Sequence, residues 1–279
     1  MGFHKILPKF YYICPMSFVT LTSDFGLQNH LVSVMKGKVY SGIPNARIVD
    51  ISHTLTPFNL QQAVYVFRQS YLHFPRGTFH FVFTDIFAHA DQKLLYVYEH
   101  GQHIFCADNG FIPMLFDDKP VQLFHLMDRL PQYDVLSVCD LFIANTISLQ
   151  QENRTGVENI AVNQIVLKRP TYPYYNNDIL EVQVMYIDFY GNVILNVTQS
   201  YFEEVRQGRK FKILFMRDEE ITQISRHYND VQEGDKLCLF NTAGYLEIAI
   251  YKGHAARLFG FQEGSERSLF YNHIKIFFE

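Results

Sequence analysis

Residues 16–167 alternate between short apolar runs and segments in which apolar residues recur every three or four positions. Runs rich in β-branched and aromatic residues predict strands at 18–21, 47–51 and 79–83. Helical spacing predicts helices at about 31–39 and 59–70 between them. This order is typical of an α/β domain with a mostly parallel sheet and helices on both faces. A hairpin over 94–106 and a helix over 140–150 complete the domain.

The pattern changes after residue 167. Residues 168–177 carry two prolines and no periodicity, which indicates a linker. Closely spaced short strands follow and predict a small β-barrel or sandwich; they span residues 180–187, 193–197, 210–215, 236–240, 245–250 and 269–277. We therefore expect an N-terminal extension over 1–15, an α/β domain over 16–167 and an all-β domain over 178–279.

Composition excludes several classes of function. The chain has 279 residues, of which 48% are hydrophobic, and a net charge of -4 with its 24 basic residues scattered. We expect no nucleic-acid partner, because such proteins concentrate Lys and Arg on one face. No apolar run approaches the ~18 residues of a membrane span, so we expect no membrane partner.

The cysteines and histidines give no metal or disulfide signature. Cys14, Cys106, Cys139 and Cys238 lie far apart, which favours reduced thiols in a cytoplasmic protein. The 12 histidines form no metal-binding motif. We expect neither a metal nor a separate cofactor.

Three carboxylates stand at or just after predicted strand ends: Asp24, Asp50 and Asp85. Ligands of open α/β sheets bind beyond the carboxyl ends of the strands, where a carboxylate can accept hydrogen bonds from ribose hydroxyls. Aspartate is also a common helix cap and turn residue, so position alone leaves both interpretations open.

A set of motifs, ordered along residues 18–264, carries a family resemblance. The motifs are residues 20–26 (TLTSDFG), 34–37 (VMKG), 48–53 (IVDISH), 74–78 (FPRGT), 107–110 (ADNG), 186–192 (YIDFYGN), 244–249 (GYLEIA) and 253–256 (GHAA). Each motif alone is weak, but together they resemble the S-adenosylmethionine hydroxide adenosyltransferase family, which is related to the fluorinases and chlorinases.

The resemblance implies an N-terminal α/β domain, a C-terminal all-β barrel domain and a homotrimer whose site lies between domains of neighbouring subunits. It also implies that S-adenosylmethionine is the substrate or ligand and that water displaces methionine to leave adenosine. By position, Asp24 matches the residue that binds the ribose diol, Asp188 the one facing the methionine ammonium and Asn192 the one reading adenine. Ala255 belongs to the C-terminal signature and is a further substrate-binding candidate.

The chain departs from the family where water is activated. The family uses an Asp, an Arg and a His; here Asp85 is retained, but the other two positions hold Gln92 and Ser137. His89 lies four residues after Asp85 and is a candidate base, since imidazole titrates near neutral pH. Its alternative role is that of an ordinary surface loop residue.

We expect an S-adenosylmethionine hydrolase of reduced rate with Asp85 and His89 as catalytic candidates. The alternative is an inactive relative that binds S-adenosylmethionine or adenosine as a sensor or assembly protein. A halide-type adenosyltransferase ranks below both, because no halide pocket can be read from the sequence.

Overall fold

The computed structural model describes residues 16–88, 93–126, 134–153, 156–216, 219–261 and 273–279. The described chain forms two compact units, each built from segments that are separate in the sequence. The first unit takes residues up to 54 together with 71–108 and 121–164. The second takes residues 55–70, 109–120 and 165–279.

A mixed sheet forms the first unit. Its parallel part joins neighbours in the order β2 (Ala46–Ser52), β1 (Ser17–Ser23), β3 (Phe79–Phe83) and β5 (Gln102–Ala107). Its antiparallel part continues through β4 (Leu94–Glu99), β6 (Gln122–Leu126) and β7 (Val157–Asn159). The α/β class is confirmed, and the sheet is mixed because the 94–107 hairpin extends the parallel strands.

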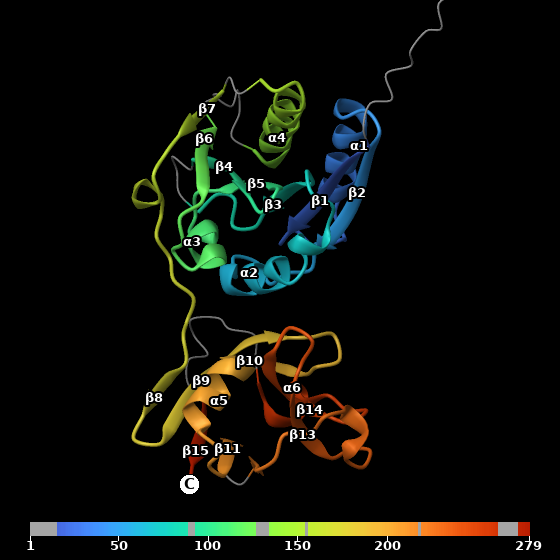
Figure 1. The fold of residues 1–279 in the computed structure, drawn as a ribbon. Coiled ribbons are helices and arrows are strands. Elements are labelled where there is room, and N and C mark those ends of the chain that lie inside the picture. The colour runs from blue at the N-terminus through green and yellow to red at the C-terminus, as the bar shows by residue number, and fades with distance from the viewer. Residues whose placement is uncertain (1–15, 89–92, 127–133, 154–155, 217–218, 262–272) are drawn as a thin grey trace, which may run out of the picture. The chain divides into compact units, whose positions relative to one another are not determined.

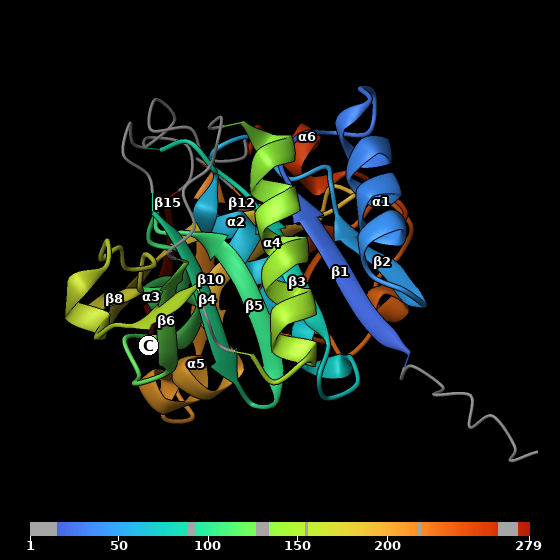
Figure 2. The ribbon, with the colours of Figure 1, turned by 90° about the horizontal axis from the view of Figure 1, so that it is seen from above.

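Helices α1 (Leu31–Gly42) and α4 (Val135–Gln150) lie side by side on one face of this sheet (Figures 1 and 2). Every residue of β3 is buried, as expected of a strand with parallel neighbours on both sides. Met35 and Val39 of α1 and Phe142 of α4 join the same hydrophobic core. A 3-10 turn, Tyr71–His73, leads toward β3.

Helices α2 (Leu60–Arg68) and α3 (Phe111–Phe116) belong to the second unit, although both come early in the chain. Asn59 caps α2 by accepting a hydrogen bond from the Gln62 backbone N–H at 3.0 Å. The rings of Phe67 and Phe111 join the two helices with centroids 5.5 Å apart. The sequence pattern predicted α2 but not α3.

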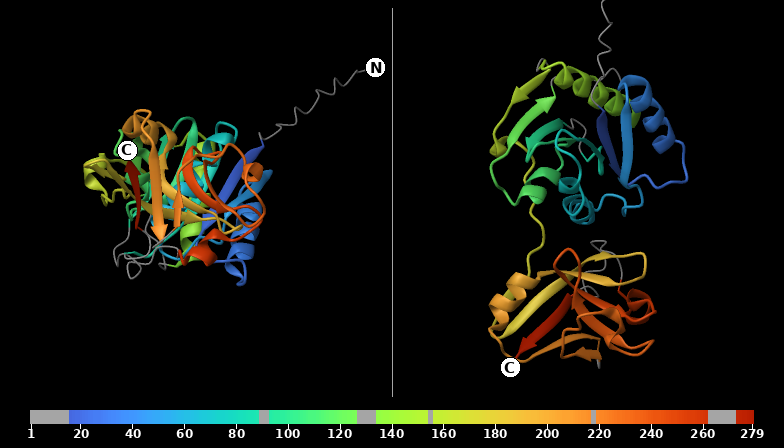
Figure 3. Two further views of the ribbon diagram at one scale, coloured as in Figure 1. Left: turned by 90° about the horizontal axis from the view of Figure 1, so that it is seen from below. Right: turned by 45° about the vertical axis from the view of Figure 1, so that its right-hand side comes forward.

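An antiparallel sheet in the second unit curves into a nearly closed barrel (Figure 3). Ile224 bridges to Cys238, and Ser225 donates to the Cys238 carbonyl at 2.8 Å, so one edge is joined to the other. The barrel domain is thus confirmed. Its strand order is β12 (Glu219–Ile221), β11 (Phe211–Met216), β15 (His273–Phe278), β9 (Ile179–Ile187), β10 (Val193–Thr198), β14 (Tyr245–Ile250) and β13 (Lys236–Phe240).

Shorter elements complete the second unit. Strand β8 (Tyr174–Asn176) lies in the segment expected as a linker, and it pairs with β9. Helices α5 (Gln199–Arg206) and α6 (Ala255–Phe259) pack on the barrel and contribute Phe202, Ala255 and Phe259 to its core. No described helix has the length and apolar character needed to cross a bilayer.

Candidate functional site

Two predicted site residues of the first unit come together at the ends of adjacent strands. β1 and β3 are parallel, with Ser23 opposite Phe83, so Asp24 and Asp85 leave the sheet at the same edge. The Asp85 backbone N–H donates to Asp24 Oδ2 at 3.1 Å. Asp85 has a φ of +45°, a left-handed conformation that aspartate tolerates better than most residues. The loop geometry therefore fixes the Asp24 carboxylate beside the Asp85 turn.

Asp50 pairs with two basic side chains. Its carboxylate pairs with Lys36 Nζ at 2.5 Å and with His53 Nε2 at 3.1 Å. Burial opposes ionisation, but these two partners outweigh it and hold the pKa of Asp50 below its usual value. The other ring nitrogen of His53 lies 2.6 Å from Ser23 Oγ. Asp50 thus anchors the strand ends through the buried His53.

The same histidine also fixes the loop that carries Asp24. The Gly26 backbone N–H donates to the His53 carbonyl at 2.7 Å, two residues beyond Asp24. His53 is only 3% exposed. Sequence reasoning assigned it no role beyond its motif, and its contacts now show that it supports the candidate ribose-binding loop.

Ser137 stands where the family resemblance places a catalytic histidine, at the start of α4. Its hydroxyl donates to Asp134 Oδ2 at 2.9 Å, and its backbone N–H donates to Asp134 Oδ1 at 3.0 Å. Asp134 is the N-cap of α4, and these hydrogen bonds lower the pKa of its carboxyl group. Ser137 therefore serves the helix cap, and a hydroxyl supplies no base at neutral pH.

Two positions that matter for water activation, His89 and Gln92, lie outside the described residues. The role of His89 as a base stays a prediction.

The remaining predicted residues gather in the second unit, around the turn between β9 and β10. Asn192 donates to Asp188 from its backbone N–H at 2.8 Å and from its side-chain amide at 3.0 Å. Gly191 has a φ of +81° and contacts His254, and its carbonyl accepts from the Ala256 N–H at 2.9 Å. Ala255 is completely buried in the first turn of α6. Asp188, Asn192 and the Ala255 segment therefore form one local structure.

A buried carboxylate, Glu247 of β14, lies near this turn, and sequence reasoning missed it. Glu247 is 3% exposed and accepts a hydrogen bond from the Tyr228 hydroxyl at 2.7 Å. Burial raises its pKa, and the Asp188 charge adds to the rise. A glutamate inside the run Leu246–Ile248 was the available signal. Two acidic groups near one another favour a cationic ligand group.

The described residues hold no other reactive cluster. They contain no group of His, Cys, Asp and Glu arranged to hold a metal ion. Cys106, Cys139 and Cys238 are buried and unpaired, and burial raises the pKa of all three thiols, to about 12 for Cys139 and Cys238. Cys14 lies outside the described residues.

Together these features define a two-unit protein with polar ligand-type residues at the strand ends of an α/β sheet and at one turn of a barrel. The model of the S-adenosylmethionine hydroxide adenosyltransferase N-terminal domain matches residues 19–157, and that of the C-terminal domain matches residues 182–268. The chain belongs to this family.

Curated relatives resemble the chain along most of its length. An (R)-S-adenosyl-L-methionine hydrolase of Methanocaldococcus jannaschii is 22% identical over 255 residues, covering 87% of this chain and 92% of the relative. The Thermus thermophilus protein of the same name is 23% identical, covering 88% and 96%.

Solved structures share the fold. An uncharacterized conserved protein from Thermotoga maritima superposes with a TM-score of 0.78 at 23% identity, covering 92% of this chain and 99% of the other. A conserved hypothetical protein from Thermus thermophilus gives 0.69 at 20% identity, covering 95% and 100%.

Proposed function

We propose that this chain binds S-adenosylmethionine and hydrolyses it to adenosine and methionine at a reduced rate. The family and its named hydrolases support the reaction class. The observation that carries the proposal is the Asp24–Asp85 arrangement, which holds a partly buried carboxylate at the carboxyl ends of two parallel strands. A carboxylate fixed in this way can accept both hydroxyls of a ribose diol.

The proposed reaction needs little machinery. A water oxygen forms a bond to the 5′ carbon as the carbon–sulfur bond breaks, and methionine leaves as a neutral thioether. No general acid is required, because the sulfonium takes up the bonding electron pair. The proton of the attacking water passes to a base, for which Asp85 and His89 are the candidates. The other proposed contacts are those of Asp188 with the methionine ammonium and of Asn192 with adenine, and Ala255 is a further substrate-binding candidate.

A second candidate function is binding without turnover. It is favoured by Ser137, whose hydroxyl is held in the α4 cap and cannot replace a histidine. The groups of a water-activating set work as a unit, so losing two of them costs orders of magnitude in rate. Ligand binding depends on other residues and is affected less. In this case the chain acts as a sensor or assembly protein.

The first experiment measures adenosine released from S-adenosylmethionine by the purified protein and by Asp24→Asn. The substitution keeps an oxygen that can accept from the Asp85 N–H but removes the charge. We expect adenosine binding, measured by calorimetry, to weaken by tenfold or more, since hydrogen bonds to charged groups contribute about 1.5–3 kcal/mol.

Asp140→Asn is the matched control, because Asp140 pairs with Lys38 on the helical face and is not among the proposed ligand contacts. Unchanged adenosine affinity in Asp24→Asn would contradict the proposed site. Binding without adenosine release would select the second function.

A double variant, Gln92→Arg with Ser137→His, separates the two functions further. It restores the family's residue types at both changed positions. We expect hydrolysis to rise by about 10²-fold or more, because positioned acid–base groups contribute 10²–10⁴-fold. The single variants are the controls, and each should gain less than the pair.

We further propose that the protein is a homotrimer, as the family resemblance implies, and that it is cytoplasmic, as the widely spaced cysteines favour. The oligomeric state is read directly by sedimentation equilibrium of the full chain. A monomer with full hydrolytic activity would contradict a site shared between subunits.

A further inference from the structure

A cavity of about 490 Å³ lies within the second unit, and none of its lining residues has a role in the proposed reaction. α2, α3, the segment 170–173 and strands of the barrel all contribute to its wall. Small-molecule sites are typically about 300–1,000 Å³, apolar in lining and equipped with a few polar groups. This cavity has that size and composition.

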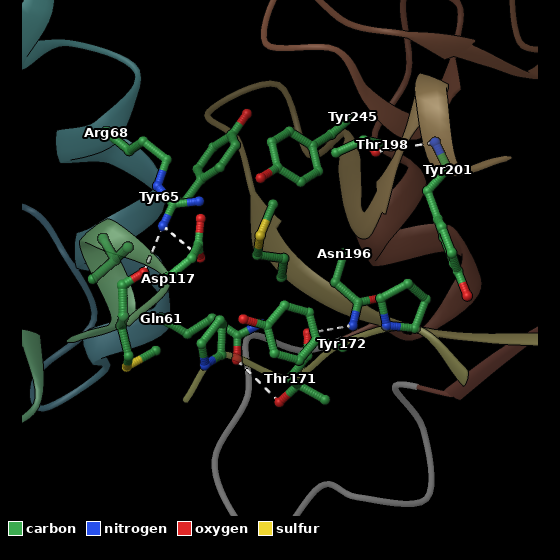
Figure 4. Close-up of a pocket in the computed structure, with 15 residues that line it drawn as sticks. Gln61, Tyr65, Arg68, Asp117, Thr171, Tyr172, Asn196, Thr198, Tyr201 and Tyr245 are labelled. Carbon is green, nitrogen blue, oxygen red and sulfur yellow. Dashed lines mark hydrogen bonds and ion pairs between the residues drawn. The ribbon is translucent and has the colours of Figure 1, made fainter. Parts of the chain in front are cut away.

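Aromatic and other apolar side chains form most of the wall. Tyr65 and Tyr245 lie on one side of the hollow and Tyr172 on the opposite side (Figure 4). The rings of Tyr65 and Tyr245 meet edge to face with centroids 5.6 Å apart. Met114 and Met185 complete the apolar surface. Such a wall suits an apolar or aromatic group, through ring and sulfur contacts.

A basic and an acidic side chain lie next to each other at one end of the cavity. The Arg68 guanidinium lies 3.1 Å from Asp117 Oδ1 and donates through the same nitrogen to the Leu115 carbonyl at 2.7 Å (Figure 4). The Arg68 Nε is buried and has no hydrogen-bond partner among the described residues. The hydrogen bonds of the guanidinium to described residues all run through Nη2, so Nη1 retains its donors, and Asp117, with a second carboxylate oxygen, retains an acceptor.

Hydrogen bonds fix the polar side chains that line the cavity. Asn196 donates to the Thr171 carbonyl at 2.8 Å, and the Thr171 hydroxyl donates to Gln61 Oε1 at 3.3 Å. Burial raises the pKa of Tyr65 to about 12, and the pKa of Tyr172 is also raised. Both phenols therefore stay neutral and available for packing against an apolar group.

We propose that this cavity binds a free α-amino acid with a long apolar or aromatic side chain. Its carboxylate meets Arg68, its ammonium meets Asp117, and its side chain lies among the tyrosines and methionines. A zwitterion matches the adjacent opposite charges, whereas an anion or a cation alone would meet one repulsive partner. The site is distinct in its residues from the proposed nucleoside site.

The experiment titrates the full-length protein with L-phenylalanine, which is not a product of the proposed reaction, and follows binding by calorimetry. We expect saturable binding, with L-methionine binding comparably. L-Alanine lacks the apolar group, N-acetyl-L-phenylalanine lacks the ammonium and L-phenylalaninamide lacks the carboxylate. The two singly charged analogues should bind at least tenfold more weakly, because each loses a charge-assisted hydrogen bond. L-Alanine should also bind at least tenfold more weakly, because it buries far less apolar surface.

Matched variants locate the site. Asp117 and Asp118 both have positive φ, which asparagine tolerates, but only Asp117 lines the cavity. Asp117→Asn should weaken L-phenylalanine binding about tenfold, and Asp118→Asn should not. Tyr172 and Tyr174 are similarly exposed, at 59% and 62%, but only Tyr172 lines the cavity. Tyr172→Ala should weaken binding, and Tyr174→Ala should not.

Three results would overturn the proposal: no binding of either amino acid, equal binding of the singly charged analogues, or unchanged binding in both Asp117→Asn and Tyr172→Ala. Asp24→Asn separates this proposal from the proposed function. Binding of L-phenylalanine should be unchanged in that variant, even where adenosine binding is lost.

Discussion

Gly191 combines a left-handed backbone conformation with a close contact to a neighbouring side chain. Its φ is +81°, and an added Cβ would lie 2.0 Å from His254 Nδ1. The ring cannot move freely, because the same nitrogen accepts the Arg257 N–H that begins α6, at 3.1 Å. The turn that presents Asp188 and Asn192 therefore depends on both a backbone conformation and a close contact.

We predict that Gly191→Ala destabilises the protein more than Gly208→Ala. Gly208 has a similar φ of +76° but nothing within 4 Å of an added Cβ. Gly208→Ala therefore measures only the cost of a side chain in the left-handed conformation, about 1–2 kcal/mol. Gly191→Ala adds the steric overlap and should cost roughly 1–3 kcal/mol more. Urea unfolding measures both free energies. Equal losses would mean that His254 moves aside without cost.

His80 predicts a pH dependence of stability. It is fully buried, with Nδ1 2.7 Å from Thr20 Oγ1 and Nε2 3.2 Å from Gln102 Oε1. Burial lowers its pKa to about 4, from 6.5. The folded state thus disfavours protonation, so the contribution of neutral His80 is complete above about pH 6.5 and is lost as the pH falls toward 4.

The test compares the free energy of unfolding of the wild type with that of His80→Gln between pH 7 and pH 4. Other groups titrate in both proteins, so the difference isolates His80. We expect the advantage of the wild type to shrink by on the order of 2–3 kcal/mol on acidification. A constant difference across this range would show that His80 does not titrate as described.

Elements with a clear period were predictable from the sequence, and elements without one were not. β3 was predicted at its observed bounds, Phe79–Phe83, because its apolar run is short and ends at polar residues. α3 was missed because all of Phe111–Phe116 is buried, which removes any amphipathic period. α5 was missed because it interrupts a series of strands.

The candidate site was predictable to a similar extent. Motif order placed Asp24, Asp85, Asp188 and Asn192, and the structure joins them in two local pairs. The order of the motifs did not reveal the roles of His53 and Glu247, because their burial and hydrogen bonds depend on segments that are distant in the sequence. Nor did it show that Ser137 is held by the Asp134 cap.

At the level of elements, Asp134 should support α4 as an N-cap. It accepts from the backbone N–H groups of Leu136 and Ser137 at 2.8 and 3.0 Å. We predict that Asp134→Ala lowers the free energy of unfolding, because two backbone N–H groups at the start of α4 lose their acceptor. Thermal unfolding measures the loss. Asp140→Ala, farther along the same helix, should have a smaller effect because Asp140 caps no backbone group in the structure.

At the scale of the whole molecule, the chain passes repeatedly between two units that each have a hydrophobic core. Unfolding of the second unit includes α2 and α3. The chain runs directly from each of these helices into a segment of the first unit. We therefore predict that both units unfold in one transition. The chain has no tryptophan, so Phe124→Trp and Phe240→Trp provide one half-buried fluorescent reporter per unit. Coincident urea midpoints support coupling, and separate midpoints exclude it.

The early position of α2 and α3 in the chain has a consequence for synthesis. Both helices leave the ribosome before residues 165–279, with which they form a compact unit. At about 5–20 residues per second, that remaining stretch takes on the order of 10 s to translate. During this interval Tyr65 of α2 lacks Tyr186 and Tyr245, against which its ring packs in the folded protein. The nascent chain thus passes through a stage in which chaperones can bind an exposed apolar helix pair.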